Sequence, residues 1–220
     1  AMRGGIHRIP YALLSARGNI DVAGPVTLSN QTAAVRGMLL HAGGTVSHDA
    51  AVQRISLPGR NPDLAEQAGD KTYAAASTDA FFRQWFGADK TFVRQQAVQI
   101  RCQGECSGSI ASAGSRVFWL DGDARLSSGN LGSAAAPVII IASGAVQIAG
   151  SVRITGIVYS MAPATQVQLG MGALDGALIA EQRLQVSQGG QLNYNPLVLQ
   201  RAQSMLGRFV PVPGSWSDGE

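Results

Sequence analysis

The sequence predicts an all-β fold: a right-handed parallel β-helix, or solenoid, with a small α-helical insertion and a C-terminal capping helix and tail. Three observations support this prediction. A unit made of a short apolar run, a glycine-containing corner and an alternating strand recurs along the chain. In the C-terminal half, equivalent positions recur about every twenty residues, a period typical of stacked repeats. The chain also contains 27 glycines and only 14% charged residues, which suits many short strands turned by glycine.

The repeating unit explains how such a chain builds a core. The units lie at residues 11–24, 37–47, 117–127, 138–150, 156–169 and 176–187. Strand side chains alternate between two faces, so that Val146, Ile148, Val152 and Ile154 all point to one side. One unit cannot bury its apolar face alone, but stacked units share a continuous core. The alternative is an antiparallel β-sandwich, with turn signals about every 8–12 residues. Two different strands in fixed order within each unit favour the solenoid.

Residues 61–100 interrupt the repeats and predict a helical insertion. Asn61-Pro62-Asp63 is a helix start signal, with proline at the first helical position. Ser77-Thr78-Asp79 then caps an amphipathic run that Gly87 ends, and a second short helix is expected over residues 89–96. The run carries an aromatic stripe, Phe81, Phe82, Trp85 and Phe86. Such a stripe either packs the helix onto the domain or contacts a partner, and packing is the commoner use.

The C-terminal region, about residues 193–220, predicts a cap. A helix is expected around Leu197–Leu206, with Gly207 as its stop, followed by a proline-rich tail. The ends of a solenoid are open strand edges that invite aggregation, so a terminal helix and tail would cover one of them. Trp216 in this tail either anchors it or contacts a partner. Trp85, Phe86 and Trp216 are therefore the candidate partner contacts.

Length and charge bound the remaining possibilities. Residues 1–2 (Ala1-Met2) are interpreted as the remnant of a cleaved tag, and residues 3–220 as one solenoid domain. The net charge of +3 is spread thinly, with no run of Lys or Arg, which argues against nucleic-acid binding. The longest apolar run, Pro137–Ala142, is far below the roughly 18 residues that a membrane span needs.

Cys102 and Cys106 are separated by three residues. A redox motif has two intervening residues and a zinc site needs four ligands, which the scattered His7, His41 and His48 do not complete. The pair therefore predicts a small disulfide-closed loop in an oxidising compartment, and two buried free thiols are the other possibility.

Acidic residues provide the case for an enzyme, because β-helices host polysaccharide lyases and hydrolases that need paired carboxylates. Asp121 and Asp123 could form such a pair, yet no second acidic cluster lies one repeat later. The simpler interpretation is that Asp121, Asp123 and Asp175 are turn residues bonded to backbone amides. No phosphate loop or nucleophile motif is present. The sequence thus predicts no catalytic, cofactor-binding or metal-binding residues, and no cofactor.

Several stretches resemble the C-terminal, extracytoplasmic domain of PilX-type type IV pilus assembly proteins, which are bacterial minor pilins. They span most of the chain: residues 78–87, 118–126, 131–141, 156–159, 176–179, 194–199 and 212–216, the last ending in Pro-Gly-Ser-Trp. The resemblance implies a structural role in pilus biogenesis or adhesion, without catalytic residues. It implies other pilin or minor pilin subunits and pilus assembly proteins as partners. The implied location is the extracellular pilus or periplasmic face, with inner-membrane anchoring before assembly through an N-terminal helix that this sequence does not contain.

Two other functions compete with this one. A carbohydrate-binding or polysaccharide-cleaving β-helix is the runner-up, with Asp121 and Asp123 as its candidate acids. A cytoskeletal solenoid that polymerises end to end is the third, and the predicted cap argues against it.

Overall fold

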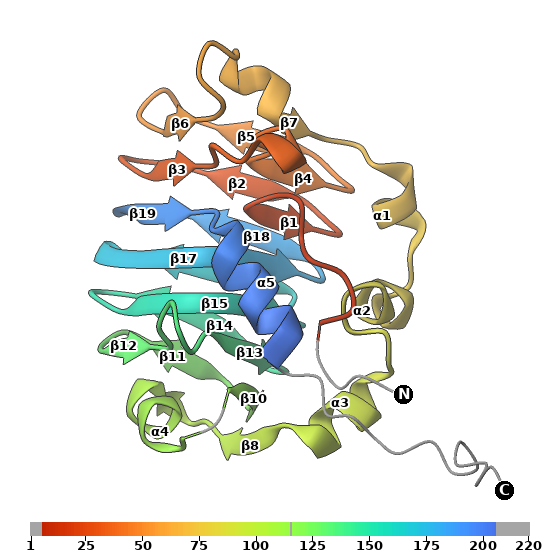
Figure 1. The fold of residues 1–220 in the computed structure, drawn as a ribbon, viewed down its shortest axis with the longest axis vertical. Coiled ribbons are helices and arrows are strands. Elements are labelled where there is room, and N and C mark those ends of the chain that lie inside the picture. Colours follow the sequence, from red (N-terminus) through yellow and green to blue (C-terminus); the bar gives the residue numbers. More distant parts are fainter. Residues whose placement is uncertain (1–5, 115, 206–220) are drawn as a thin grey trace, which may run out of the picture.

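The chain folds mostly into β-strands arranged in two large parallel sheets, with few helices (Figure 1). The structure is a computed structural model and describes residues 6–114 and 116–205. All strand pairings among these residues are parallel, so the antiparallel sandwich alternative is wrong. The all-β prediction is confirmed at this level.

The larger sheet has twelve strands. In chain order they are β1 (Leu14–Ala16), β3 (Thr27–Ser29), β4 (Leu40–Ala42), β6 (Gln53–Ile55), β7 (Glu66–Gln67), β8 (Val98–Arg101), β10 (Val117–Asp121), β12 (Asn130–Leu131), β13 (Val138–Ala142), β15 (Arg153–Ser160), β17 (Gly170–Ala180) and β19 (Gly189–Asn193).

The smaller sheet has seven strands and runs in the order β5-β2-β18-β16-β14-β11-β9. Their bounds are β2 (Ile20–Val22), β5 (Val46–His48), β9 (Gly104–Glu105), β11 (Ala124–Leu126), β14 (Val146–Ala149), β16 (Ala164–Gln168) and β18 (Arg183–Val186). The chain passes back and forth between the sheets, and we call one strand of the smaller sheet with its flanking larger-sheet strands a rung.

The first and last rungs of the described chain lie side by side. Strands β1, β2 and β3 pair with β17, β18 and β19 respectively. Leu14 lies beside Leu178, Ile20 beside Leu184, and Leu28 beside Leu192, and all six side chains are buried. The spatial order of the rungs therefore differs from their order in the sequence.

This order fixes the path of the chain. From the first rung it moves to β4, β5 and β6 at one end of the stack, then crosses to β8 and β9 at the opposite end (Figure 1). From there it builds rungs back until β19 meets β3. Residues 68–97, which we call the strap, make the crossing along one side of the stack. The strap spans seven strand spacings of the larger sheet, about 34 Å.

Three α-helices form the strap: α1 (Lys71–Ala75), α2 (Thr78–Phe86) and α3 (Lys90–Gln96). The Ser77 hydroxyl accepts a hydrogen bond from the Ala80 amide, and Gly87 ends α2 at φ +67°. Asp89 caps α3 in the same way. These two helices match the sequence prediction, whereas Asn61 begins only a 3₁₀-helix, Pro62–Ala65. A second 3₁₀-helix spans Ala33–Val35, and α4 (Ser107–Ser112) was not predicted.

The C-terminal helix, α5 (Pro196–Met205), lies where the sequence predicts a helix, but it does not cap an end of the stack. It packs across β15 and β17, two interior strands (Figure 1). Asn195 donates a hydrogen bond to Asp175, and Gln203 donates one to the backbone oxygen of His7. The helix therefore does not form the predicted cap, because the last described rung is an interior rung and the helix that follows it starts at mid-stack. The predicted tail lies outside the described residues.

A glycine corner allows the long strands β15 and β17 to bend between two directions. Gly156 and Gly176 are partners in adjacent strands and have φ angles of +144° and +148°. A Cβ atom at Gly176 would lie 1.8 Å from the Gly156 carbonyl oxygen, and one at Gly156 would lie 1.9 Å from that of Val138. Only glycine therefore lets successive rungs stack at the usual spacing of about 4.8 Å.

Gly176→Ala is expected to lower the free energy of unfolding by at least about 2 kcal/mol, because it adds both a steric clash and backbone strain. Urea denaturation measures the loss. Gly108→Ala is the matched control, since a Cβ there meets nothing within 4 Å and alanine favours the helix α4. Equal stability of the Gly176→Ala variant and the wild type would contradict this account of the corner.

Candidate functional site

The aromatic stripe of α2 faces the larger sheet. Trp85 is fully buried and Phe86 is 3% exposed. The Phe86 ring lies 5.2 Å from that of Tyr159 on β15, between ring centroids, and Phe82 packs edge-on to the same tyrosine. The packing interpretation therefore holds, and Trp85 and Phe86 present no surface to a partner. Trp216, the third candidate contact, lies outside the described residues.

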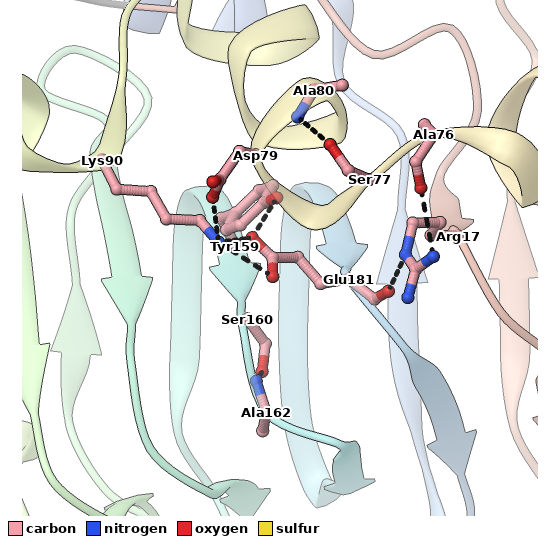
Figure 2. A network of polar contacts seen from close by, with 10 residues as sticks. All are labelled: Arg17, Ala76, Ser77, Asp79, Ala80, Lys90, Tyr159, Ser160, Ala162 and Glu181. Carbon is pink, nitrogen blue, oxygen red and sulfur yellow. Dashed lines mark hydrogen bonds and ion pairs between the residues drawn. The ribbon is translucent and has the colours of Figure 1, made fainter.

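A buried carboxylate fixes the strap to the stack (Figure 2). Glu181, directly after β17, is 2% exposed, and its carboxylate accepts a hydrogen bond from the Tyr159 hydroxyl at 2.9 Å. Lys90 of α3 lies 3.0 Å from the same carboxylate and 3.2 Å from that of Asp79. Burial raises the pKa of Glu181, while Lys90 and Tyr159 oppose that rise. The backbone oxygen of Glu181 accepts a further hydrogen bond from Arg17.

A second buried polar group holds the start of the strap. The ring of His41 on β4 is 1% exposed and lies 2.7 Å from a carboxylate oxygen of Asp70. Burial lowers the pKa of His41. Burial opposes ionisation of Asp70, but hydrogen bonds from His41 and from the Thr72 and Tyr73 amides hold its pKa below the ordinary value. Asp70 is also the N-cap of α1, so one carboxylate joins strand and helix.

Ser15, His41 and Asp70 are the residue types of a nucleophile triad, and Ser15 is the strand partner of His41. The arrangement is nevertheless unsuited to acyl transfer. The Ser15 hydroxyl is fully buried and makes no hydrogen bond to His41. No substrate reaches a nucleophile sealed in this way, so we assign the cluster to packing of the strap.

Of the three predicted turn acids, Asp123 has the expected backbone-amide bond, whereas Asp121 and Asp175 are bound by side chains. Asp123 accepts a hydrogen bond from the Ala145 backbone amide at 2.8 Å, as a turn residue does. Asp121 instead lies 2.8 Å from Arg94 of the strap and accepts a hydrogen bond from the Trp119 indole. Asp175 binds Asn195 ahead of α5. These contacts explain the three carboxylates as structural groups.

Cys102 and Cys106 form a disulfide. Cys102 follows β8 and Cys106 follows β9, so the bond closes the turn between the two sheets at the end of the stack. Within residues 6–114 and 116–205 no group of three or more His, Cys, Asp or Glu is arranged to hold a metal ion. No helix in the same part of the chain is long and apolar enough to cross a membrane.

The outer face of the smaller sheet carries a row of polar side chains, one from each strand. We call it the polar row. Strand register aligns its members from one end of the stack to the other: Glu105, Arg125, Gln147, Gln166, Gln185, Asp21 and Ser47. Their neighbours on each strand point inward and are mostly buried, for example Val146, Ile148, Leu184 and Val186. Parallel strands lie about 4.8 Å apart, so the row has a regular spacing.

Hydrogen bonds order the two ends of the polar row, and in its middle the Gln147 amide donates to the Gln168 side-chain oxygen at 3.1 Å. At one end Asp21 accepts bonds from Ser47, at 2.6 Å, and from Arg183, at 2.7 Å. These bonds are the main reason that the pKa of Asp21 is lowered. At the other end the Glu105 carboxylate accepts a hydrogen bond from the backbone amide of Ser107. The side chains of Arg125, Gln166 and Gln185 make no hydrogen bond or ion pair to any described residue. The row therefore presents three polar side chains that are not engaged by the described part of the chain.

Comparison of the chain with protein-family models, with curated proteins and with solved structures finds no match. The resemblance to minor pilins therefore stays a prediction.

Sequence reasoning missed both the polar row and the buried groups beneath the strap. A signal for the row exists: Gln147, Gln166 and Gln185 follow one another at intervals of nineteen residues, the period of the repeats. No comparable signal marks Glu181 or Lys90, because their contact joins residues of the strap to a rung distant in the sequence.

Lys90→Met is expected to destabilise the protein by about 2–4 kcal/mol at pH 7.5, because it leaves the buried Glu181 carboxylate without its cation. The pKa of Glu181 would then rise further above its unfolded value, so the folded state would take up a proton as the pH falls. The deficit should therefore shrink between pH 7.5 and pH 5, as measured by urea denaturation at both pH values.

Lys71→Met, an exposed lysine on α1 of the same strap, is the matched control and should change stability by less than about 0.5 kcal/mol. A Lys90→Met deficit that is equally small, or one that does not vary with pH, would show that the Lys90–Glu181 contact does not hold the strap.

Proposed function

We propose that this chain is a structural display domain, the globular extracytoplasmic part of a PilX-type minor pilin that acts in pilus biogenesis or adhesion. Its partners are other pilin or minor pilin subunits and pilus assembly proteins, and its location is the pilus or the periplasmic face of the inner membrane. The observation that carries the proposal is the pairing of the first rung with the last, which locks the whole stack into one body.

We further propose that the two sheets wind as a right-handed solenoid. Strands of the larger and smaller sheets alternate along β13, β14, β15, β16, β17 and β18, and each strand pairs in parallel with the equivalent strand of the next rung. Connections between parallel strands of one sheet are right-handed in nearly all proteins. The roughly twenty-residue spacing of the sequence units agrees with one unit for each turn.

The chemistry of the described residues favours display over catalysis. Glu181 and His41 are buried and engaged by the strap, and Asp121 and Asp123 are bonded to an arginine and to a backbone amide. A catalytic carboxylate pair needs exposure to substrate and environments that separate the two pKa values. A rigid stack with polar outer faces supports a protein that works by contact. The resemblance of several sequence stretches to minor pilins supports the family.

In-frame deletion of the gene in the source bacterium is expected to reduce surface pili, twitching motility and adhesion, because assembly would lack one subunit. Electron microscopy of surface pili and motility assays measure the effect, and complementation with the full-length gene is the control. A prepilin-type leader and a hydrophobic helix upstream in the gene would add support. Normal pili, motility and adhesion after deletion would refute the proposal.

A further inference from the structure

We propose that the polar row on the smaller sheet binds a neutral, hydroxyl-rich polysaccharide chain laid across its strands. This inference rests on the proposed display function and names the surface through which the domain makes contact. It is carried by the unengaged side chains of Arg125, Gln166 and Gln185, the exposure of that face, and the near-absence of net charge along the row.

The smaller sheet presents its outer face to solvent. The helices make their main strand contacts with the larger sheet: α3 with β8, α4 with β12, and α5 with β15 and β17. Tyr73 of α1 packs against His41 of β4 with the two rings tilted, and α2 packs on Tyr159 of β15, both in the larger sheet. In the polar row Arg125 and Gln166 are exposed, and Gln147 and Gln185 are partly exposed. A ligand can therefore reach the row without displacing a helix.

The middle of the row supplies the groups that bind hydroxyls. A glutamine side chain offers two N–H donors and one carbonyl acceptor, and arginine offers five donors in a planar fork. Sugar hydroxyls both donate and accept, so adjacent amides can satisfy them in either direction. From Arg125 to Asp21 the row covers four strand spacings, about 19 Å, which is long enough to lie under several units of an extended chain.

The charge of the row disfavours polyanions. Arg125 and Arg183 are balanced by Asp21 and Glu105, and Arg183 is already paired with Asp21 at 2.7 Å. Nucleic acids and acidic polysaccharides need a cluster of unpaired cations, whereas this row has a single unpaired cation, Arg125. Binding of a neutral polymer does not need such a cluster of cations.

The absence of apolar anchors in the row disfavours a protein partner. Interfaces between proteins draw most of their affinity from buried aromatic and apolar side chains at their centre. The centre of the row is Gln147, Gln166 and Gln185. Hydrogen bonds made in water give weak binding at each site, and display of many copies on a fibre would raise the overall affinity.

Affinity electrophoresis and pull-down test the proposal with the 220-residue protein and named probes: hydroxyethyl cellulose and galactomannan as soluble neutral polymers, chitin as an insoluble one, and alginate as the anionic comparison. We expect retardation or retention by at least one neutral polymer and none by alginate. The variant with Gln147→Ala, Gln166→Ala and Gln185→Ala should lose roughly tenfold in affinity.

The matched control replaces Gln53 and Gln191 with alanine on the outer face of the larger sheet, where both flank Thr27 and are exposed. This control should bind as the wild type does, and both variants should keep the wild-type circular dichroism spectrum and melting temperature. Failure of every neutral polymer to bind, binding to alginate alone, or equal binding by the triple variant would each overturn the proposal.

Two further outcomes separate this inference from the proposed function. Self-association of the wild type that the triple variant abolishes, measured by analytical ultracentrifugation, would make the row a protein interface and overturn the polysaccharide. In the source bacterium, the triple variant should assemble normal pili yet adhere less to surfaces coated with the bound polymer. Loss of pili in that strain would refute the polysaccharide role while leaving the assembly function standing.

Discussion

The backbone pairing between the first and last rungs is the constraint on which the rest of the structure depends. In most stacked-repeat proteins each repeat contacts only its neighbours in sequence, and the terminal repeats are exposed edges. Here β1 joins β17 in the interior of the stack, so the first and last described rungs are protected, and both ends of the described stack are built from segments between them. β1 also pairs with β4, but its other edge has no partner until β17 is in place, which makes the two halves of the chain mutually dependent.

That pairing also explains the strap and its composition. A chain that starts at mid-stack and fills one end must travel the full height of the stack to begin the other. The strap covers the larger sheet, and the covered positions on successive rungs are apolar. Four of them are aligned in register and buried: Ile179, Tyr159, Ile141 and Trp119. The aromatic stripe of α2 packs on this row, which is why a stripe that could have met a partner is internal.

Sequence reasoning found what local patterns encode and missed what depends on rung order. Gly176 at a corner, Ser77 as a cap and the alternation around Val146 are local signals, and the all-β class and two strap helices follow from them. Which rung lies beside which is decided by pairing between distant segments, and no window of sequence contains it. The position of α5 and the burial of Glu181 both depend on that order, so neither could be predicted from the sequence.

Each rung has one side buried beneath the strap and one side exposed to solvent, and the two sides carry different residues. Tyr159 and Gln166 stand seven residues apart in consecutive strands, yet one is buried under the strap and the other is exposed. A face kept only for solubility gains most from scattered lysine and glutamate. The polar row instead repeats glutamine, and the only lysines of the sequence, Lys71 and Lys90, lie in the strap. Solubility does not require uncharged amides repeated at strand spacing, and these are the groups that the proposed binding of a neutral polysaccharide would use.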